Sequence, residues 1–396
     1  MEEKTLIQNI INNMKEIQQK IIGFLEKDNP SENDFIDLKS FLINQQISEN
    51  KYKLRSLFHL IAKISNNYHH SSHFYSQIDQ IIQLYKNEIQ QNFSNQEIFN
   101  TFKGSKRILL FLFEENILEP NTTIASIITS PKYQKRYYPQ YFIPEFKSIF
   151  DESQLKQIID DYERSFRNRE VIKYDSESFK QLRKIGENDD YISRLIRDDS
   201  IVEFVTYVNQ TNYQLSQTIK KSIFETNTFL IKNNPSLIEY AAFFGSIQIF
   251  QYLFNNKIRL SSFLWPFAIH GNNPDLIHFL EENQIKLSSQ DIKKCLVESI
   301  KCHHNEIANY IMSNYLQDIE NKQCNINFFS QSLKNHNYIL FDIEFDEKMN
   351  NFCKFITEND ENMDYNLLFD LCQHDYLSFV EIFLNIKNLN INMKTI

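Results

Sequence analysis

The sequence predicts an all-α protein whose C-terminal half is a row of helical hairpins stacked into a solenoid. Glycine and proline are rare, with 5 and 8 among 396 residues, which argues against the many turns of a β-sandwich or barrel. Apolar residues recur every three or four positions, as on one face of a helix. One helical pattern also recurs along the chain, which is typical of repeat proteins.

The first element expected is an amphipathic helix that ends at Asp28-Asn29-Pro30-Ser31, where Ser31 is suited to cap the next helix. Two further helical patterns follow at 53–64 and 74–89. The apolar stripe of the first helix consists of Leu6, Ile10, Met14, Ile17, Ile21 and Leu25. We therefore expect a divergent N-terminal helical region over residues 1–118.

Residues 119–150 hold four of the eight prolines and the run KRYYPQYFIPEF. This composition predicts an irregular connector packed by its own aromatic side chains. Basic and aromatic residues interleaved in this way can also stack on single-stranded nucleic acid. The run KRYYPQYF has only two cations in a chain of net charge −9, so the packed connector is favoured. Residues 151–230 are expected to be a helical region leading into the repeats.

Residues 231–396 predict about five degenerate repeats, the last of them incomplete. The segment EYAAFFGSIQIFQYLFNN aligns with PFAIHGNNPDLIHFLEEN at a shift of 27, and further shifts of 31, 33 and 39 reach three more copies. The first helix of each unit carries a small residue that lets it pack closely on its neighbour. These small residues are Ala241, Ala268, Ser299 and Ser332.

Gly245 is expected to form the turn between the two helices of its repeat, because a positive φ costs glycine little. The equivalent positions hold polar residues that tolerate such a turn with decreasing ease: Asn272, His303, His336 and Asp375.

The segment SLIEYAAFFGSIQIFQYL resembles the helix pair of an ankyrin repeat. More narrowly, the strings at 186–200, 222–253, 264–272 and 298–311 are similar to an ankyrin-containing family of unknown function that is expanded in parasitic protists. The resemblance implies an ankyrin-type helical-hairpin solenoid with a concave face that binds proteins. The Thr-Pro-Leu-His motif of ankyrin repeats is degraded here, so fewer hydrogen bonds between units are expected.

The segment GSKRILLFLFEENI at 104–117 matches GSIQIFQYLFNNKI at 245–258, at a shift of 141. This match favours an N-terminal half of divergent helical hairpins continuous with the repeats. A separate all-α domain is the alternative.

In ankyrin units the positions just before the turn, together with the loop tips between units, face the concave side. Their chemistry varies here while the packing positions stay apolar, as expected for a protein-binding face. Phe243 is expected to be the anchor if it is exposed, although it could instead pack under the preceding loop. A merely solvated face is the alternative for the whole column, which is Phe243, His270, Lys301, Lys334 and Gln373.

Two groups of potential metal ligands are better explained without a metal. Cys295, Cys302, His303 and His304 could suggest zinc, but the repeat pattern accounts for them. The histidines of NYHHSSHFY, which are His69, His70 and His73, are expected in a solvated loop. We expect no cofactor, metal or catalytic residue. The alternative is a hydrolase or transferase with an unrecognised Cys/His site in the N-terminal half, marked by a deep pocket and a perturbed carboxylate.

The remaining composition points to a non-enzymatic scaffold or adaptor in the cytoplasm. The five cysteines include no Cys-x-x-Cys pair, and the chain has neither a signal peptide nor an apolar run that could enter a membrane. A net charge of −9 without a basic face disfavours nucleic acid, and no glycine-rich loop suggests a small-molecule substrate. A third interpretation is that the chain is a fragment without a role of its own, because the repeat pattern stops at NLNINMKTI. This interpretation predicts that the purified chain aggregates.

Overall fold

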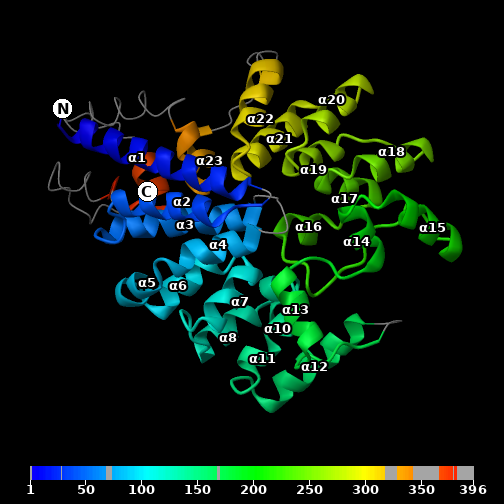
Figure 1. Cartoon of the computed structure of the whole chain (residues 1–396), viewed down its shortest axis with the longest axis horizontal. Coiled ribbons are helices and arrows are strands. Elements are labelled where there is room, and N and C mark those ends of the chain that lie inside the picture. The colour runs from blue at the N-terminus through cyan, green and yellow to red at the C-terminus, as the bar shows by residue number, and fades with distance from the viewer. Residues whose placement is uncertain are drawn as a thin grey trace. The chain divides into compact units, whose positions relative to one another are not determined.

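The computed structural model describes residues 2–27, 29–67, 74–166, 170–316, 328–341, 365–377 and 379–380. The protein is all-α, as predicted: it is 69% helical, and the described residues include no strand (Figure 1). An isolated bridge joins Thr218 to Ser236. Among the described helices, none is both long enough and apolar enough to cross a bilayer.

The chain forms two compact units. The first unit comprises 1–63 and 296–396, and the second comprises Ile64–Cys295. Its borders fall inside two helices, α3 (Lys51–Asn67) and α21 (Ser289–Lys301). The predicted boundaries at 118, 150 and 230 follow sequence pattern, and all three lie within the second unit.

The other helices of the first unit come from both ends of the chain. They are α1 (Glu2–Leu25), α2 (Glu32–Asn44), α22 (Asn305–Ile311), the π-helix η1 (Met312–Leu316), α23 (Phe328–Asn335), the 3-10 helix η2 (Tyr338–Leu340) and α25 (Tyr365–Gln373).

The second unit holds the remaining helices, most of them short. They are α4 (Phe74–Gln83), α5 (Lys86–Asn92), α6 (Asn95–Phe102), α7 (Lys106–Glu114), α8 (Thr122–Ile128), α9 (Pro131–Gln134), α10 (Tyr138–Tyr141), α11 (Ile143–Phe146), α12 (Glu152–Ser165), α13 (Glu177–Ile185), α14 (Tyr191–Arg197), α15 (Ile201–Thr211), α16 (Thr228–Asn233), α17 (Leu237–Phe244), α18 (Ile247–Asn255), α19 (Leu264–His270) and α20 (Pro274–Glu282).

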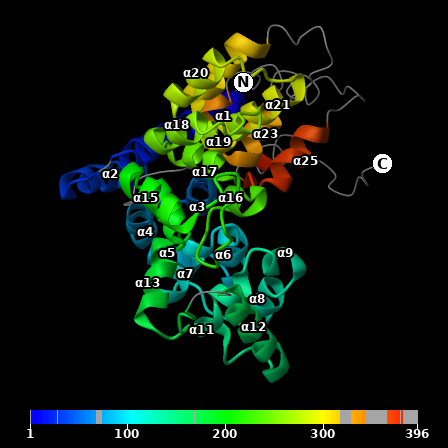
Figure 2. The same ribbon diagram turned by 90° about the vertical axis from the view of Figure 1, so that its right-hand side faces the viewer.

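The segment 119–150, expected to be irregular, instead contains the four short helices α8 to α11 (Figure 2). Proline lies in the first turn of α9, α10 and α11, where its missing N–H costs nothing, so the prolines start helices here. The expected aromatic packing is present. Tyr138, Tyr141, Phe142 and Phe146 are fully buried and contact one another edge to face or tilted.

The hairpin turns have the predicted backbone. All five predicted positions have a positive φ, and Asp199 adds a sixth turn between α14 and α15, so φ ranges from 46° to 67° over the set. In each turn the next residue donates its N–H to the carbonyl oxygen five positions earlier, at 2.9 to 3.2 Å. This is the longer bond of the Schellman motif, which ends a helix at a left-handed residue.

Successive hairpins of the second unit pack on one another in chain order (Figure 1). Helix α14 packs on α17, α17 packs on α19, and α15 packs on α18. A Cβ at Gly271 would lie 2.6 Å from the carbonyl oxygen of Phe243, so the approach of α17 to this turn requires glycine. The four small residues predicted to allow close packing are all fully buried: Ala241, Ala268, Ser299 and Ser332.

A side-chain hydrogen bond recurs between neighbouring hairpins. The residue after the left-handed position donates to a carbonyl near the end of the preceding hairpin's first helix. Ser246 Oγ donates to the Ile196 carbonyl in the second unit. In the first unit, Asn337 Nδ2 donates to Ile300 O at 3.0 Å, and Tyr376 Oη donates to Leu333 O at 3.0 Å. These bonds tie hairpin to hairpin from a position outside the degraded motif.

The predicted likeness between 104–117 and 245–258 extends to backbone geometry. Helices α7 and α18 have the same bounds after the shift of 141, and each ends before a left-handed residue, Asn116 with φ 55° and Lys257 with φ 63°. The likeness stops at Gly104, which lacks the positive φ of Gly245.

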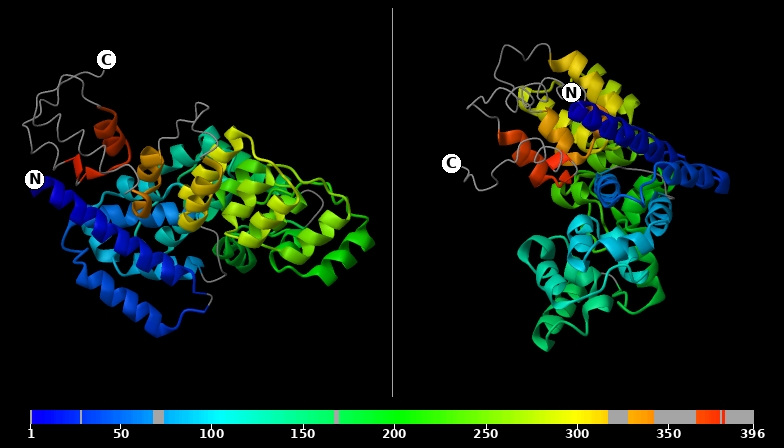
Figure 3. Two further views of the ribbon diagram at one scale, coloured as in Figure 1. Left: turned by 90° about the horizontal axis from the view of Figure 1, so that it is seen from above. Right: turned by 90° about the vertical axis from the view of Figure 1, so that its left-hand side faces the viewer.

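In the first unit, α1 is the dark blue helix of Figure 3. It packs on α2 and on η2. Gln18 is fully buried at this contact. Its Nε2 donates to His303 Nδ1 and to Asn337 Oδ1, both at 2.9 Å, and its Oε1 accepts from the N–H of Ile339. Asn337 Nδ2 also donates to Asn305 Oδ1 at 2.8 Å. The first helix of the chain is thereby fixed to two hairpin turns far along the sequence.

Candidate protein-interaction surface

The expected exposed anchor, Phe243, is fully buried, and so is His270. The rings of Phe243 and His270 lie 5.4 Å apart, and the ring of Phe229 lies 6.1 Å from Phe243 and 3.9 Å from His270. Phe229 belongs to α16, in the segment before α17, so Phe243 packs beneath the preceding segment. The prediction of an exposed column is therefore wrong at these two positions.

The other three residues of the column lie in the first unit. Lys334 and Gln373 are exposed, and Lys301 is half-buried with its Nζ 3.0 Å from a carboxylate oxygen of Glu298. A binding role for these three residues stays a prediction.

Exposed and half-buried aromatic side chains lie at the loop end of the hairpins in the second unit, opposite the left-handed turns; Tyr207 and Tyr213 are the half-buried ones, and the Tyr213 hydroxyl is buried. Tyr191 begins α14 and is 41% exposed. Its ring lies 5.0 Å from Tyr207, and Tyr207 lies 6.1 Å from Tyr213. The Arg194 guanidinium lies 5.1 Å from the Tyr191 ring. Phe263, just before α19, is 65% exposed.

We call this set the loop-end aromatic surface; it consists of Tyr191, Arg194, Tyr207, Tyr213 and Phe263. The sequence indicated loop tips as part of the binding face but did not single out these residues. In the sequence, these residues could have been identified as large aromatic side chains that lie just outside the apolar stripe of a helix.

Hydrogen bonds hold the loops beneath this surface. Asn188 Nδ2 donates to Lys220 O at 2.7 Å, and Ser222 Oγ donates to Asp189 Oδ1 at 2.6 Å. Thr226 donates both its N–H and its hydroxyl to the Gly186 carbonyl. A cavity of about 30 Å³ remains between the two loops, which is room for bound water. These bonds join the loop at 186–190 to the segment at 220–226.

Buried charges lie under the same loops. Lys106 Nζ donates to Ile223 O at 2.8 Å and lies 4.9 Å from the Tyr141 ring, and burial lowers the pKa of Lys106 to about 7. Glu225 accepts the N–H of Asn227 at 2.8 Å, and burial raises the pKa of Glu225 to about 7. Buried groups with strongly shifted pKa values occur at catalytic sites and also in purely structural ion networks. Lys106 is fully buried, and its bond to a loop carbonyl gives it a positioning role.

An ion pair links the loop at 186–190 to the hairpins. Arg197 Nε lies 2.9 Å from Glu187 Oε2, and Arg197 Nη1 donates to the Tyr240 hydroxyl and to the Asn188 carbonyl. Burial raises the pKa of Glu187. Two hydrogen bonds and one ion pair from this guanidinium hold the C-terminal end of α14, the helix that carries Tyr191 and Arg194.

His59 is the described histidine of the N-terminal half, and it pairs with an aspartate. Its Nε2 lies 2.7 Å from Asp375 Oδ2, which also accepts from Arg55 Nη1 at 2.9 Å. The hydrogen bond from His59 is the main reason that the pKa of Asp375 is lowered to about 2. The pair ties α3 to the left-handed residue of the last hairpin. A Cys/His enzyme in the N-terminal half stays an untested alternative, although all five cysteines lie at or beyond Cys295.

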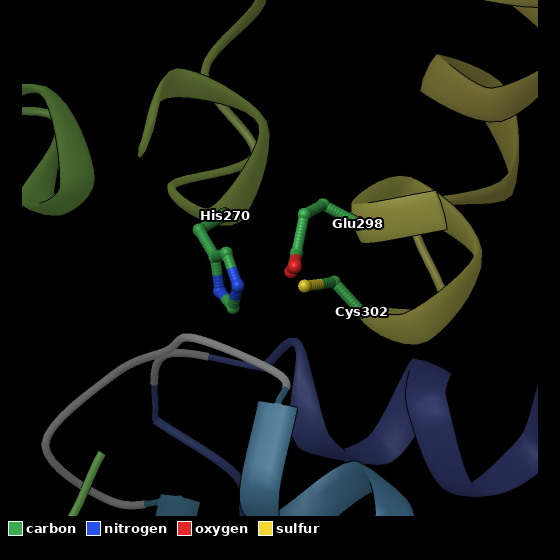
Figure 4. Close-up of side chains that lie close together, drawn as sticks. All are labelled: His270, Glu298 and Cys302. Atoms are coloured by element: carbon green, nitrogen blue, oxygen red, sulfur yellow. The ribbon is translucent and has the colours of Figure 1, made fainter. Parts of the chain in front are cut away.

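The predicted reading of Cys302 and His303 as repeat residues agrees with their surroundings. Figure 4 labels Glu298 on α21, Cys302 directly after the end of α21, and His270 at the end of α19. Burial raises the pKa of the Cys302 thiol above its ordinary value. The Nδ1 of His303 accepts from Gln18. His69, His70 and His73 lie outside the described residues.

Comparisons of the chain with models of protein families, with curated proteins and with solved structures found no match in any of the three.

Proposed function

We propose that the chain is an ankyrin-type solenoid of helical hairpins and acts as a non-enzymatic scaffold that binds another protein. The main support is the recurrence of one turn geometry at six places, together with first helices that pack in chain order. Stacked hairpins bury a continuous core and leave their loop ends free to vary, which is how repeat proteins build binding surfaces.

The loop-end aromatic surface is the proposed binding site. Tyrosine and arginine are enriched among the residues that carry binding energy. Tyrosine offers a large contact area with few rotatable bonds. Tyr191 and Phe263 belong to hairpins two apart, which is about 20 Å at 8–10 Å between packed helices. An interface of ordinary size, about 800 Å² per partner, would cover both.

A protein partner fits this surface better than nucleic acid does. Its charged member is a single arginine, and the chain has a net charge of −9, so the electrostatic attraction that phosphate binding needs is missing. Lys334 and Gln373 are candidates for an extension of the same kind of face in the first unit.

Affinity capture from cell extract tests the proposal, with the native chain and a Tyr191→Ala/Phe263→Ala double variant as baits. Val202→Ala is the matched control, because Val202 is 72% exposed and lies on the same hairpin near its opposite end. Circular dichroism must first show that both variants remain helical. We expect a protein retained by the native chain and the control but at least about tenfold less by the double variant, since hot-spot truncations cost about 2 kcal/mol or more. Equal retention by all three baits would reject this surface.

A further inference from the structure

A groove runs between α1 and α2 in the first unit and plays no part in the surface described above. Phe24, Leu38 and Phe41 provide its apolar lining, and its volume is about 520 Å³. That volume lies within the range of about 300–1,000 Å³ that is usual for ligand sites. The groove is therefore large enough to accept one or two large side chains of a partner.

Gly23 opens the groove down to the backbone of α1. It lies inside the helix, where glycine costs about 1 kcal/mol relative to alanine. A Cβ built at Gly23 would meet nothing within 4 Å, so no neighbour in this chain requires a glycine. Close approach of another molecule is a reason for glycine at such a position.

The two rims of the groove carry opposite charges. Lys20 and Lys27 line the α1 side, and Asp34 and Asp37 line the α2 side. Lys27 pairs with Asp34 across one end, and the Asp34 carboxylate also accepts the N–H of Ser31 in the capping box of α2. Lys20 and Asp37 form no ion pair among the described residues, and Lys20 Nζ lies 5.8 Å from the Phe41 ring. One cation and one anion thus face each other across an apolar floor and remain available to a ligand.

We propose that this groove binds an amphipathic α-helix of a partner protein. A large apolar side chain of that helix fills the space over Gly23, between Phe24 and Phe41. An acidic residue on one flank of its apolar stripe meets Lys20, and a basic residue on the other flank meets Asp37. Helix-in-groove recognition uses this combination of apolar anchors at helical spacing with charged flanks. The mixed rim charges offer no net attraction to a lipid surface or to nucleic acid.

A displayed library of random 16-residue peptides is the probe, panned against the immobilised full chain. The blocking variant is Gly23→Leu, which places a side chain in open space on a helical backbone and is therefore expected to fold at least as stably as the native chain. Ile36→Leu is the control, because Ile36 is 48% exposed on α2 but does not line the groove. Thermal unfolding followed by circular dichroism checks that both variants are folded.

We expect enriched peptides with apolar residues at i, i+3 or i+4, and i+7, flanked by an acidic residue. These peptides should bind Gly23→Leu at least about tenfold more weakly than the native chain, a loss of about 1.4 kcal/mol, and should bind Ile36→Leu equally well. Lys20→Glu should shift the enriched flank from acidic to basic. The Tyr191→Ala/Phe263→Ala variant should still bind them, so this test is independent of the loop-end aromatic surface.

Three results would overturn the proposal. They are enrichment without a helical pattern, equal binding to Gly23→Leu, and self-association of the native chain in sedimentation that Gly23→Leu abolishes. The last result would show that a second copy of this chain occupies the groove in place of a partner protein.

Discussion

Gly245 and Gly23 place the same residue type in opposite environments. Gly245 has a φ of +67°, and a Cβ there would lie 2.9 Å from Asn273 Nδ2. Gly23 lies on a helix with nothing within 4 Å of a Cβ. The left-handed conformation costs an L-residue about 1–2 kcal/mol, whereas alanine is the best helix former.

We therefore expect Gly245→Ala to lower the free energy of unfolding by about 1–2 kcal/mol. Gly23→Ala should raise it by about 0.5–1 kcal/mol. Urea titrations followed by far-UV circular dichroism measure both changes. Equal effects of the two substitutions would contradict the assignment of Gly245 to a strained turn.

Gln18 offers a second test at the scale of single residues. Replacing it by alanine leaves His303 Nδ1 and Asn337 Oδ1 without their donor in a buried site. We expect Gln18→Ala to lower the free energy of unfolding by about 2–3 kcal/mol, because buried unsatisfied groups cost about 1–3 kcal/mol each. The neighbouring Gln19→Ala is the control, since Gln19 is exposed and its change should stay within about 0.5 kcal/mol. A Gln18→Ala effect as small as the control would argue against the network.

The sequence predicted the backbone conformation of the turn residues better than it predicted which side chains surround them. The positive φ at His303 and His336 depends on a local turn, and the alignment of these residues with Gly245 predicts that turn. The burial of Phe243 depends on α16, and the partners of Gln18 lie 285 or more positions away. No spacing in the sequence indicates such contacts.

Between elements, the hairpins are held by backbone packing and by a recurring side-chain hydrogen bond. Ser246 Oγ donates to Ile196 O, and both residues are in the second unit. We expect Ser246→Ala to cost about 1 kcal/mol of unfolding free energy, because the buried carbonyl loses its side-chain donor. Ser216→Ala, at an exposed position of the same unit, is the control.

Fluorescence of Trp265 during urea unfolding measures both serine variants, since Trp265 is the single tryptophan of the chain and is buried in the second unit. A loss in Ser246→Ala no larger than in Ser216→Ala would show that the bond does not tie the hairpins.

The helices that were predicted are those that belong to a repeating sequence pattern. The small residues at Ala241 and Ala268 and the capped start of α20 at Asn273-Pro274 follow from local chemistry. The helices α8 to α11 were not predicted, because their prolines were interpreted as breakers, whereas each proline in α9, α10 and α11 occupies a first turn. The loop-end aromatic surface was missed because exposure depends on what packs nearby.

For the whole molecule, the two compact units are expected to respond to acid in opposite directions. In the first unit, burial lowers the pKa of His303 from 6.5 to about 3. The unfolded chain then binds a proton that the folded unit does not, so stability falls as pH falls below about 6.5. In the second unit, burial raises the pKa of Glu225 from 4.5 to about 7. The folded unit then holds the extra proton, so stability rises as pH falls from about 7 to 4.5.

Urea unfolding at pH 7 and pH 5 checks this prediction. The midpoint from Trp265 fluorescence should rise at pH 5, while the helical signal should show an earlier transition from the first unit. Glu225→Gln keeps the acceptor for the Asn227 N–H and removes that titration, so its fluorescence midpoint should rise less at pH 5 than that of the native chain; a smaller rise remains, because burial also raises the pKa of Asp79, to about 6. Coincident transitions that move together with pH would contradict two independently stable units.

The most direct test of the proposed function is amide hydrogen exchange of the native chain with and without its captured partner. Binding through the loop-end aromatic surface predicts protection in peptides that cover 190–194, 207–213 and 259–264, with little change on α1 and α2. Protection confined to α1 and α2, or absent from the loop ends of the hairpins, would contradict the account.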